Sequence, residues 1–150
     1  MGKVFEDYFS ELQADMVSIC LEYVDNNADR IFIYGSCEAG MVSGDCFFEI
    51  GGKILEKHRL NQELNKDIYD TAPDRQGGML RIICEDILKI RDVCKEYGRE
   101  MPTEMKITYD VKKNSLNADY SYDLKFSNDP VKTSDDVAME WFNEIKQKYE

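Results

Sequence analysis

The chain has 150 residues, of which 43% are hydrophobic and 33% are charged, and its formal net charge is -11 at pH 7. This length and composition predict one folded domain and exclude a disordered polymer, and no apolar run approaches the roughly 20 residues that cross a bilayer. The negative charge disfavours nucleic acids and anionic membranes as partners and favours a basic protein. The acidic opening MGKVFEDYFSELQADM does not resemble a signal peptide, so we expect a cytoplasmic protein.

Apolar residues at three- and four-residue steps predict a first amphipathic helix over residues 4–24. The segment RIFIYGSC carries β-branched and aromatic residues on both faces, which indicates a strand in the middle of a sheet. A second strand, DCFFEI, is joined to a third, KILEKHRL, by two glycines that favour a hairpin turn. The polar segment 61–78 that follows has little periodicity, and we expect a long loop that either contains a turn of helix or serves a function.

The second half of the chain predicts one helix, one hairpin and a last helix. A regular apolar stripe over residues 78–97 indicates the helix. The alternating segments 103–111 and 117–126 predict an antiparallel hairpin whose outer face carries carboxylates and lysines. A final amphipathic helix is expected over residues 134–148. In the second strand of the hairpin, the predicted inward row is Ala118, Tyr120, Tyr122, Leu124 and Phe126.

The order of these elements, α-β-β-β-α-β-β-α, predicts one α+β domain over residues 1–150. We expect an antiparallel sheet of about five strands with three helices packed on one face. The clean alternation of the last two strands predicts that part of the opposite face is open to solvent. We expect a monomer or a weak homodimer.

The polar residues show no recognisable catalytic or metal-binding motif. The single histidine, His58, stands between two cations, and neither a paired CxxC nor an HExxH or DxDxDG motif occurs, so we predict no catalytic residue, metal or cofactor. The five cysteines are expected to be free thiols. Cys37 and Cys46 lie on neighbouring predicted strands, and a regulatory disulfide between them is the alternative.

The acidic residues of the predicted sheet face and of the long loop form the favoured site, a surface that binds a basic partner. An acidic surface that serves solubility alone is the simpler alternative. Two aromatic residues of the sheet are either anchors at the centre of this surface or part of a second core beneath a helix. The residues predicted to bind the partner are Asp45, Glu49, Asp67, Asp70, Asp110, Asp119, Asp123, Tyr34 and Phe47.

A different hypothesis is a small acidic hydrolase that uses Glu38, Asp45 or His58. A cleft that raised the pKa of one carboxylate would favour this enzyme. A broad acidic face without a deep pocket would favour a binding protein. An acidic adaptor protein is a third hypothesis, and it differs from the first, a protein that binds a basic partner, only in the identity of that partner.

Four segments follow one another along the chain: RIFIYGSCEAGMVSGDCFFEIGGKI, LRIICEDILKIRDVCKEY, MPTEMKITYDVKKNSLNADYSYDLKF and a last helix with a tryptophan. Their order resembles that of the bacterial YezG-type antitoxin family, whose members are immunity proteins. The tryptophan usual after the first helix of that family is absent here, where Asp29 and Arg30 stand, as in a divergent member. The resemblance implies a non-catalytic protein that binds one cognate nuclease toxin and blocks its active site or the approach to it.

Overall fold

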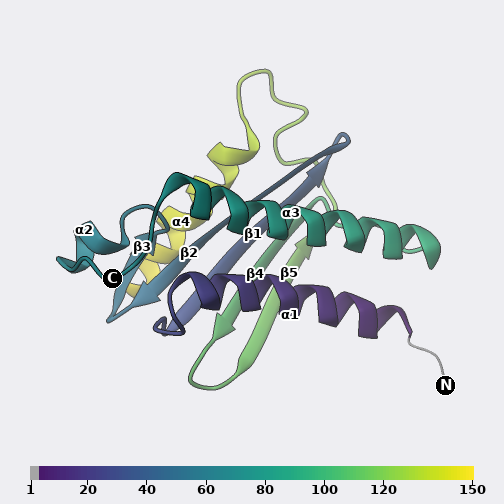
Figure 1. Cartoon of the computed structure of the whole chain (residues 1–150). Coiled ribbons are helices and arrows are strands. Elements are labelled where there is room, and N and C mark those ends of the chain that lie inside the picture. The colour runs from purple at the N-terminus through teal and green to yellow at the C-terminus, as the bar shows by residue number, and fades with distance from the viewer. Residues whose placement is uncertain (1–3) are drawn as a thin grey trace.

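Residues 4–150, which the computed structural model describes, form four helices and five strands (Figure 1). The helices are α1 (Phe5–Tyr23), α2 (Leu60–Leu64), α3 (Pro73–Glu96) and α4 (Ser134–Tyr149). The strands are β1 (Arg30–Glu38), β2 (Met41–Ile50), β3 (Lys53–Glu56), β4 (Glu104–Asp110) and β5 (Ser115–Ser121).

The strands form one antiparallel sheet in the order β3-β2-β1-β4-β5. β1 lies at the centre, where Ile33 pairs with Cys46 of β2 on one side and with Ile107 of β4 on the other. Gly51 and Gly52 connect β2 to β3 with φ angles of 59° and 81°, a conformation that other residues rarely adopt. The α+β class, the five-stranded antiparallel sheet and the central position of β1 are confirmed.

The helices cover both faces of the sheet, and the prediction of three helices on one face is wrong. α1 and α3 lie side by side on one face, over a core that includes Ile31 and Ile33, whereas α4 packs on the other face against Phe32 (Figure 1). The cause lies in β1, whose alternating side chains are apolar on both faces, so that each face must be covered. Trp141 and Phe142 of α4 supply the second cover.

The segment between β3 and α3 is more ordered than its sequence pattern indicates. β3 ends at Glu56, and the predicted continuation of the strand instead becomes a turn and the short helix α2. The side chain of Asn61 donates to the carbonyl of Tyr69 at 2.8 Å and accepts the N–H groups of Ile68 and Tyr69 at 3.2 and 3.0 Å. Pro73 occupies the first turn of α3, where a missing N–H costs nothing, so the helix begins before the predicted residue 78.

β5 is shorter than predicted and ends at Ser121. Tyr120 packs against α1 as expected. Tyr122 and Leu124 lie beyond the strand with exposed fractions of 48% and 53%, so the predicted inward row is wrong for both. Phe126 is buried, but it joins the core beneath α4 on the opposite face, because the chain crosses there to reach the last helix.

Gly44 of β2 allows close packing between the sheet and α3. A Cβ atom built on Gly44 lies 2.6 Å from Cγ2 of Ile83, a buried β-branched side chain with few alternative rotamers. We expect Gly44→Ala to lower the free energy of unfolding in urea by about 1–2 kcal/mol. The control is Gly77→Ala, at a position on α3 with nothing near its Cβ, where helix propensity should raise stability by about 1 kcal/mol. Equal stability of the two variants would contradict the packing.

Candidate protein-binding surface

The two predicted aromatic anchors, Tyr34 and Phe47, lie in the core beneath α4, with exposed fractions of 1% and 4%. The ring centroid of Phe47 lies 5.2 Å from that of Trp141 and 5.1 Å from that of Phe142. The Tyr34 hydroxyl donates a 2.7 Å hydrogen bond to Glu104, and burial together with this bond raises the pKa of Tyr34. Neither ring is available to a partner, so both belong to the second core that was the alternative for them.

Two predicted partner-binding carboxylates, Glu49 and Asp110, flank Arg30 within the sheet. Arg30 pairs with both residues in the strand register. Its guanidinium lies 2.6 Å from the Glu49 carboxylate and 3.7 Å from that of Asp110, and it stacks over the ring of Tyr149 at 4.7 Å. Glu49 is only 7% exposed. These two acids therefore neutralise an internal cation and leave little charge for a partner.

The three residues of the hydrolase hypothesis do not converge. Asp45 pairs with Lys57 at 2.9 Å, and although burial opposes the charge of Lys57, Asp45 raises its pKa. His58 is exposed, and its Nε2 lies 3.9 Å from Glu56. Glu38 stands opposite Met41 in the register whereas Asp45 stands opposite Tyr34, which separates the two carboxylates by about 13 Å along the sheet.

Glu38 holds the chain that leads to α4. Its buried carboxylate accepts the backbone N–H groups of Lys125, Phe126 and Ser127 at 2.9, 3.2 and 2.8 Å, and it also accepts the Ser127 hydroxyl. Burial alone would raise the pKa of Glu38, but these hydrogen bonds outweigh it and lower the pKa. The carboxylate is thus a structural acceptor.

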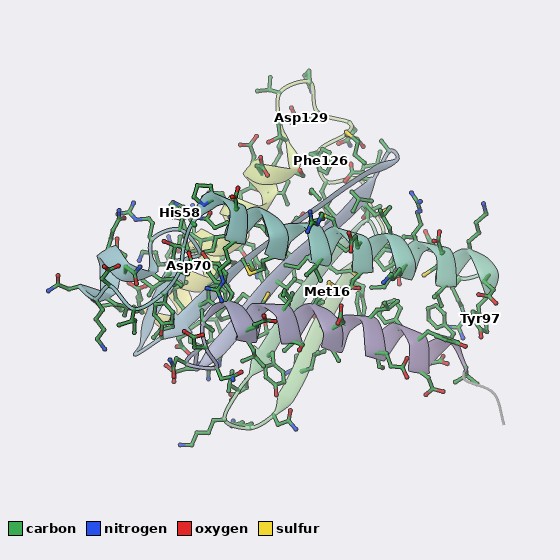
Figure 2. The ribbon with its side chains drawn as sticks, viewed as in Figure 1. Met16, His58, Asp70, Tyr97, Phe126 and Asp129 are labelled. Carbon is green, nitrogen blue, oxygen red and sulfur yellow. The ribbon has the colours of Figure 1, made fainter. Side chains whose placement is uncertain are left out.

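The other predicted acids lie on the surface, at opposite edges of the sheet. Asp67 and Asp70 follow α2 beside the β3 edge, and Figure 2 shows Asp70 near this end of the molecule, far from Tyr97. Asp119 and Asp123 are exposed on and after β5, at the other edge. Asp119 stands opposite Lys106 of β4. The predicted acidic face is therefore divided, and its members do not form one patch.

All charged side chains of helix α1 are acidic, and none of the predicted partner-binding residues lies on it. Its residues include five carboxylates and no lysine or arginine. One of them, Glu6, pairs with Arg99 at 3.1 Å. The remaining four are exposed at four- and seven-residue steps, so they form a stripe along one side of the helix. This acidic stripe consists of Asp7, Glu11, Asp15 and Glu22.

Beside this stripe lies a buried carboxylate on α3. Asp86 is 2% exposed, and its Oδ2 atom has no hydrogen-bond partner within the described residues. Burial, a hydrogen bond shared with the carboxyl of Asp15 and the charge of Asp15 raise the pKa of Asp86 to about 7, with Lys89 opposing the rise and Glu85 adding to it. The internal partner of Asp86 is therefore Asp15, through a shared proton. An acid in the apolar stripe of a predicted helix is a signal present in the sequence, since Asp86 stands four residues from both Ile82 and Ile90.

A separate groove of about 210 Å³ lies between α1 and α3, and neither Asp15 nor Asp86 lines it. Ile19 and Ile82 form part of its walls, one helical turn from Asp15 and Asp86 respectively. Arg75 lines its far end, where the guanidinium donates to the backbone carbonyls of Glu22, Tyr23 and Asp70. The groove therefore has mixed walls, since Glu22 and Arg81 line it as well as the two isoleucines.

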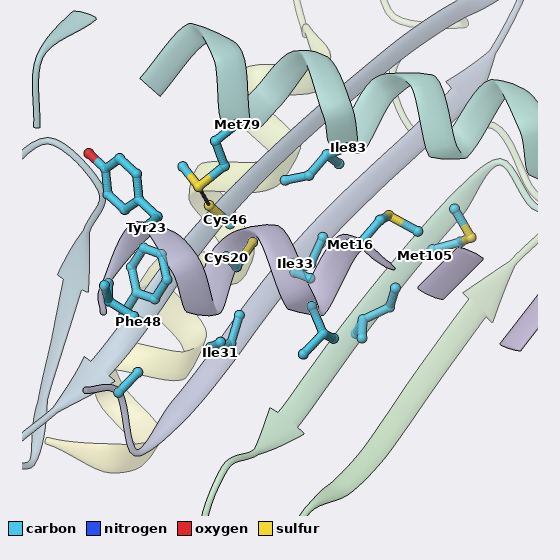
Figure 3. Close-up of a cluster of buried hydrophobic side chains, with 14 of the residues drawn as sticks. Met16, Cys20, Tyr23, Ile31, Ile33, Cys46, Phe48, Met79, Ile83 and Met105 are labelled. Atoms are coloured by element: carbon cyan, nitrogen blue, oxygen red, sulfur yellow. Dashed lines mark hydrogen bonds between the residues drawn. The ribbon is translucent and has the colours of Figure 1, made fainter. Parts of the chain in front are cut away.

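All five cysteines are free, and the structure does not support a disulfide between Cys37 and Cys46. The partners of these residues in the register are Val42 and Ile33, which places the two thiols about 13 Å apart along the sheet, beyond disulfide reach. Cys46 instead lies beside Cys20 and Met79 in the core beneath α1 and α3 (Figure 3).

Within residues 4–150, no helix is both long and apolar enough to cross a membrane, and no three histidine, cysteine, aspartate or glutamate side chains are grouped to hold a metal ion. Comparison of the chain with protein-family models and with curated protein sequences finds no match.

Proposed function

We propose that this protein is an immunity protein that binds a basic bacterial nuclease toxin in the cytoplasm and blocks its action. The observation that carries the proposal is the charge of α1, whose five carboxylates have no lysine or arginine among them. A nuclease attracts phosphates, so its substrate groove is positively charged. An acidic helix is complementary to such a groove and can occupy it in place of nucleic acid.

One exposed carboxylate on β5, Asp119, and one after the strand, Asp123, lie at the edge of the sheet next to α1. The rings of Tyr120 on β5 and Phe9 on α1 lie 5.4 Å apart, which places β5 beside α1. Asp119 faces away from α1, because it alternates with Tyr120 and stands opposite Lys106, whose ammonium lies over the ring of Trp141. Asp119 and Asp123 therefore belong at most to the rim of the proposed interface. Rim charges steer association and set its salt dependence more than they add affinity.

The test is capture of the partner from the native host with tagged protein, at about 0.05 M and about 0.5 M salt. We expect a basic protein that is retained at low salt and largely released at high salt, because screening weakens exposed charge pairs. Its nuclease activity, measured on plasmid DNA and on RNA, should fall in proportion to the immunity protein added and reach zero at one equivalent.

Retention of an acidic or salt-insensitive partner would contradict the proposal and favour an adaptor. A basic partner whose nuclease activity persists in the complex would likewise contradict neutralisation. Capture of no partner from cells that express the neighbouring genes would also count against the immunity function.

A further inference from the structure

We propose that the protein forms a homodimer in which the β5 strands of two copies pair antiparallel and join their five-stranded sheets into one continuous sheet. The occupant of the β5 edge is a second copy of this chain. The proposal concerns the protein alone, so it does not depend on the immunity function or on the nature of a toxin.

The first observation is that the two edges of the sheet are protected unequally. β3 is only four residues long, and the backbone N–H of Ile54 on this edge already donates to the carboxylate of Glu150 at 2.8 Å. β5 is seven residues long, and within residues 4–150 its only strand neighbour is β4. Its sequence, SLNADYS, has one charged residue and no lysine or proline, so it lacks the usual devices that keep an edge strand from pairing.

The second observation is that β5 is complementary to itself. Two identical antiparallel strands are related by a twofold axis perpendicular to the sheet, and residues that stand opposite each other lie on the same face. With the axis at Ala118, all seven residues of β5 find a partner in the second copy. The opposite pairs are then Leu116 with Tyr120, Asn117 with Asp119, and Ser115 with Ser121.

These pairs match the side chains that β5 leaves exposed. Leu116 and Tyr120 lie on one face by alternation, with exposed fractions of 38% and 37%. Leu116 stands next to the turn between β4 and β5, which projects past α1, so the Tyr120 ring of the second copy can pack against it (Figure 1). On the other face, the exposed Asn117 amide can donate to the exposed Asp119 carboxylate. Each contact occurs twice because of the symmetry.

The charge of the chain selects this register and gives the dimer a characteristic salt dependence. An axis at Asp119 would place that carboxylate directly opposite its own copy, which like-charge repulsion disfavours. Each copy has a net charge of -11 at pH 7, so the two copies repel each other and salt screens the repulsion. We therefore expect the dimer to tighten about threefold or more from about 0.05 M to about 0.5 M salt. The proposed binding of a basic toxin has the opposite salt dependence.

Sedimentation equilibrium of the purified protein at roughly 5–500 µM measures the dimer, because its fraction rises with concentration. Asn117→Asp places two carboxylates opposite each other at both ends of the strand pair and should weaken the dimer about tenfold or more. Asn117→Asp combined with Asp119→Asn exchanges the two side chains, keeps the net charge and should restore the dimer to within about threefold of the wild type. The matched control is Gln62→Glu, which adds the same charge at an exposed site on α2 and should leave the dimer unchanged within about threefold.

A cysteine cross-link tests the register. Ala118→Cys places two Cα atoms about 4.5–5.5 Å apart across the axis, within the range of a disulfide. Oxidised glutathione then joins the two introduced thiols by exchange and leaves two reduced glutathione molecules. Leu116→Cys is the control, since its two copies would lie roughly 14 Å apart along the sheet. On a non-reducing denaturing gel we expect a cross-linked dimer from Ala118→Cys only, with the wild type as background for the five native cysteines.

A wild-type protein that stays monomeric over the whole concentration range would overturn the proposal. So would a dimer that Asn117→Asp leaves unchanged, or a cross-link that forms with Leu116→Cys and not with Ala118→Cys. These measurements contain no toxin, so their failure would leave the immunity function as it stands, and failure of the capture experiment would leave the dimer as it stands.

Discussion

Replacing Glu38 with alanine is expected to lower the free energy of unfolding by about 3–4 kcal/mol, because it removes a charged acceptor from three backbone N–H groups and one hydroxyl. Part of this lost stability comes from the Phe126 N–H, which would remain buried without a hydrogen-bond partner. Another part comes from weaker packing of the Phe126 side chain beneath α4. Urea unfolding at pH 7, monitored by the fluorescence of Trp141, measures the change.

The pH dependence of the wild type follows from the same contacts. The folded-state pKa of Glu38 lies below its ordinary value of 4.5, so the stabilisation is fully present above about pH 4.5 and is lost as the pH falls through the folded pKa. Glu144→Gln, on an exposed site of α4, should leave stability within about 0.5 kcal/mol. A Glu38→Ala variant as stable as Glu144→Gln would show that the 125–127 segment does not depend on this carboxylate.

Asp86→Asn is expected to stabilise the protein by about 2–4 kcal/mol at pH 8. The folded-state pKa of about 7 exceeds the ordinary value of 3.8, and each pKa unit corresponds to about 1.4 kcal/mol. Between these two values the folded protein holds a proton that the unfolded chain has released. The stability of the wild type therefore decreases as the pH rises from about 4 to about 7, and the loss is complete above that.

An amide cannot ionise, so the variant avoids this loss, and its advantage should shrink toward zero near pH 4. Chemical denaturation at pH 4, 6 and 8 provides the comparison. Asp15→Asn is the companion variant, because it removes the second cause of the raised pKa and should recover part of the gain. A variant at residue 86 that is less stable than the wild type at pH 8 would show that the carboxylate has a stabilising internal partner at that pH.

The layers of the fold are well predicted by sequence periodicity where one face is apolar. Alternation in β4 and the stripe in α3 place Met105, Ile107 and Ile83 correctly against one another. The position of α4 is not predicted, because an apolar stripe around Trp141 identifies the buried side of a helix without indicating which face of the sheet it covers. The apolar residues on both faces of β1 do indicate that the second face needs a cover, and the final helix is the element that provides it.

The candidate site is harder to predict because exposure and pairing depend on tertiary neighbours. The sequence pattern places Glu49 and Asp110 on an acidic surface. In the folded sheet the strand register places Arg30 between them, and their charges pair with its guanidinium. The one-sided charge of α1 is visible in the sequence alone. The burial of Asp86 beside Asp15 is not visible in the sequence, since it depends on the helix packed against α3.

The division of the interior into two cores also has a consequence for motion. Residues 122–150 supply the whole cover of one face of the sheet, with Phe126, Trp141 and Phe142 among its apolar side chains, whereas α1 and α3 cover the other face. Because this layer is one contiguous segment with a core of its own, we expect it to open as one unit while the remainder stays folded. Each opening bares Phe32 and Phe47 on the central strands, and two molecules that open together can exchange their last helices. We expect domain-swapped dimers at high protein concentration.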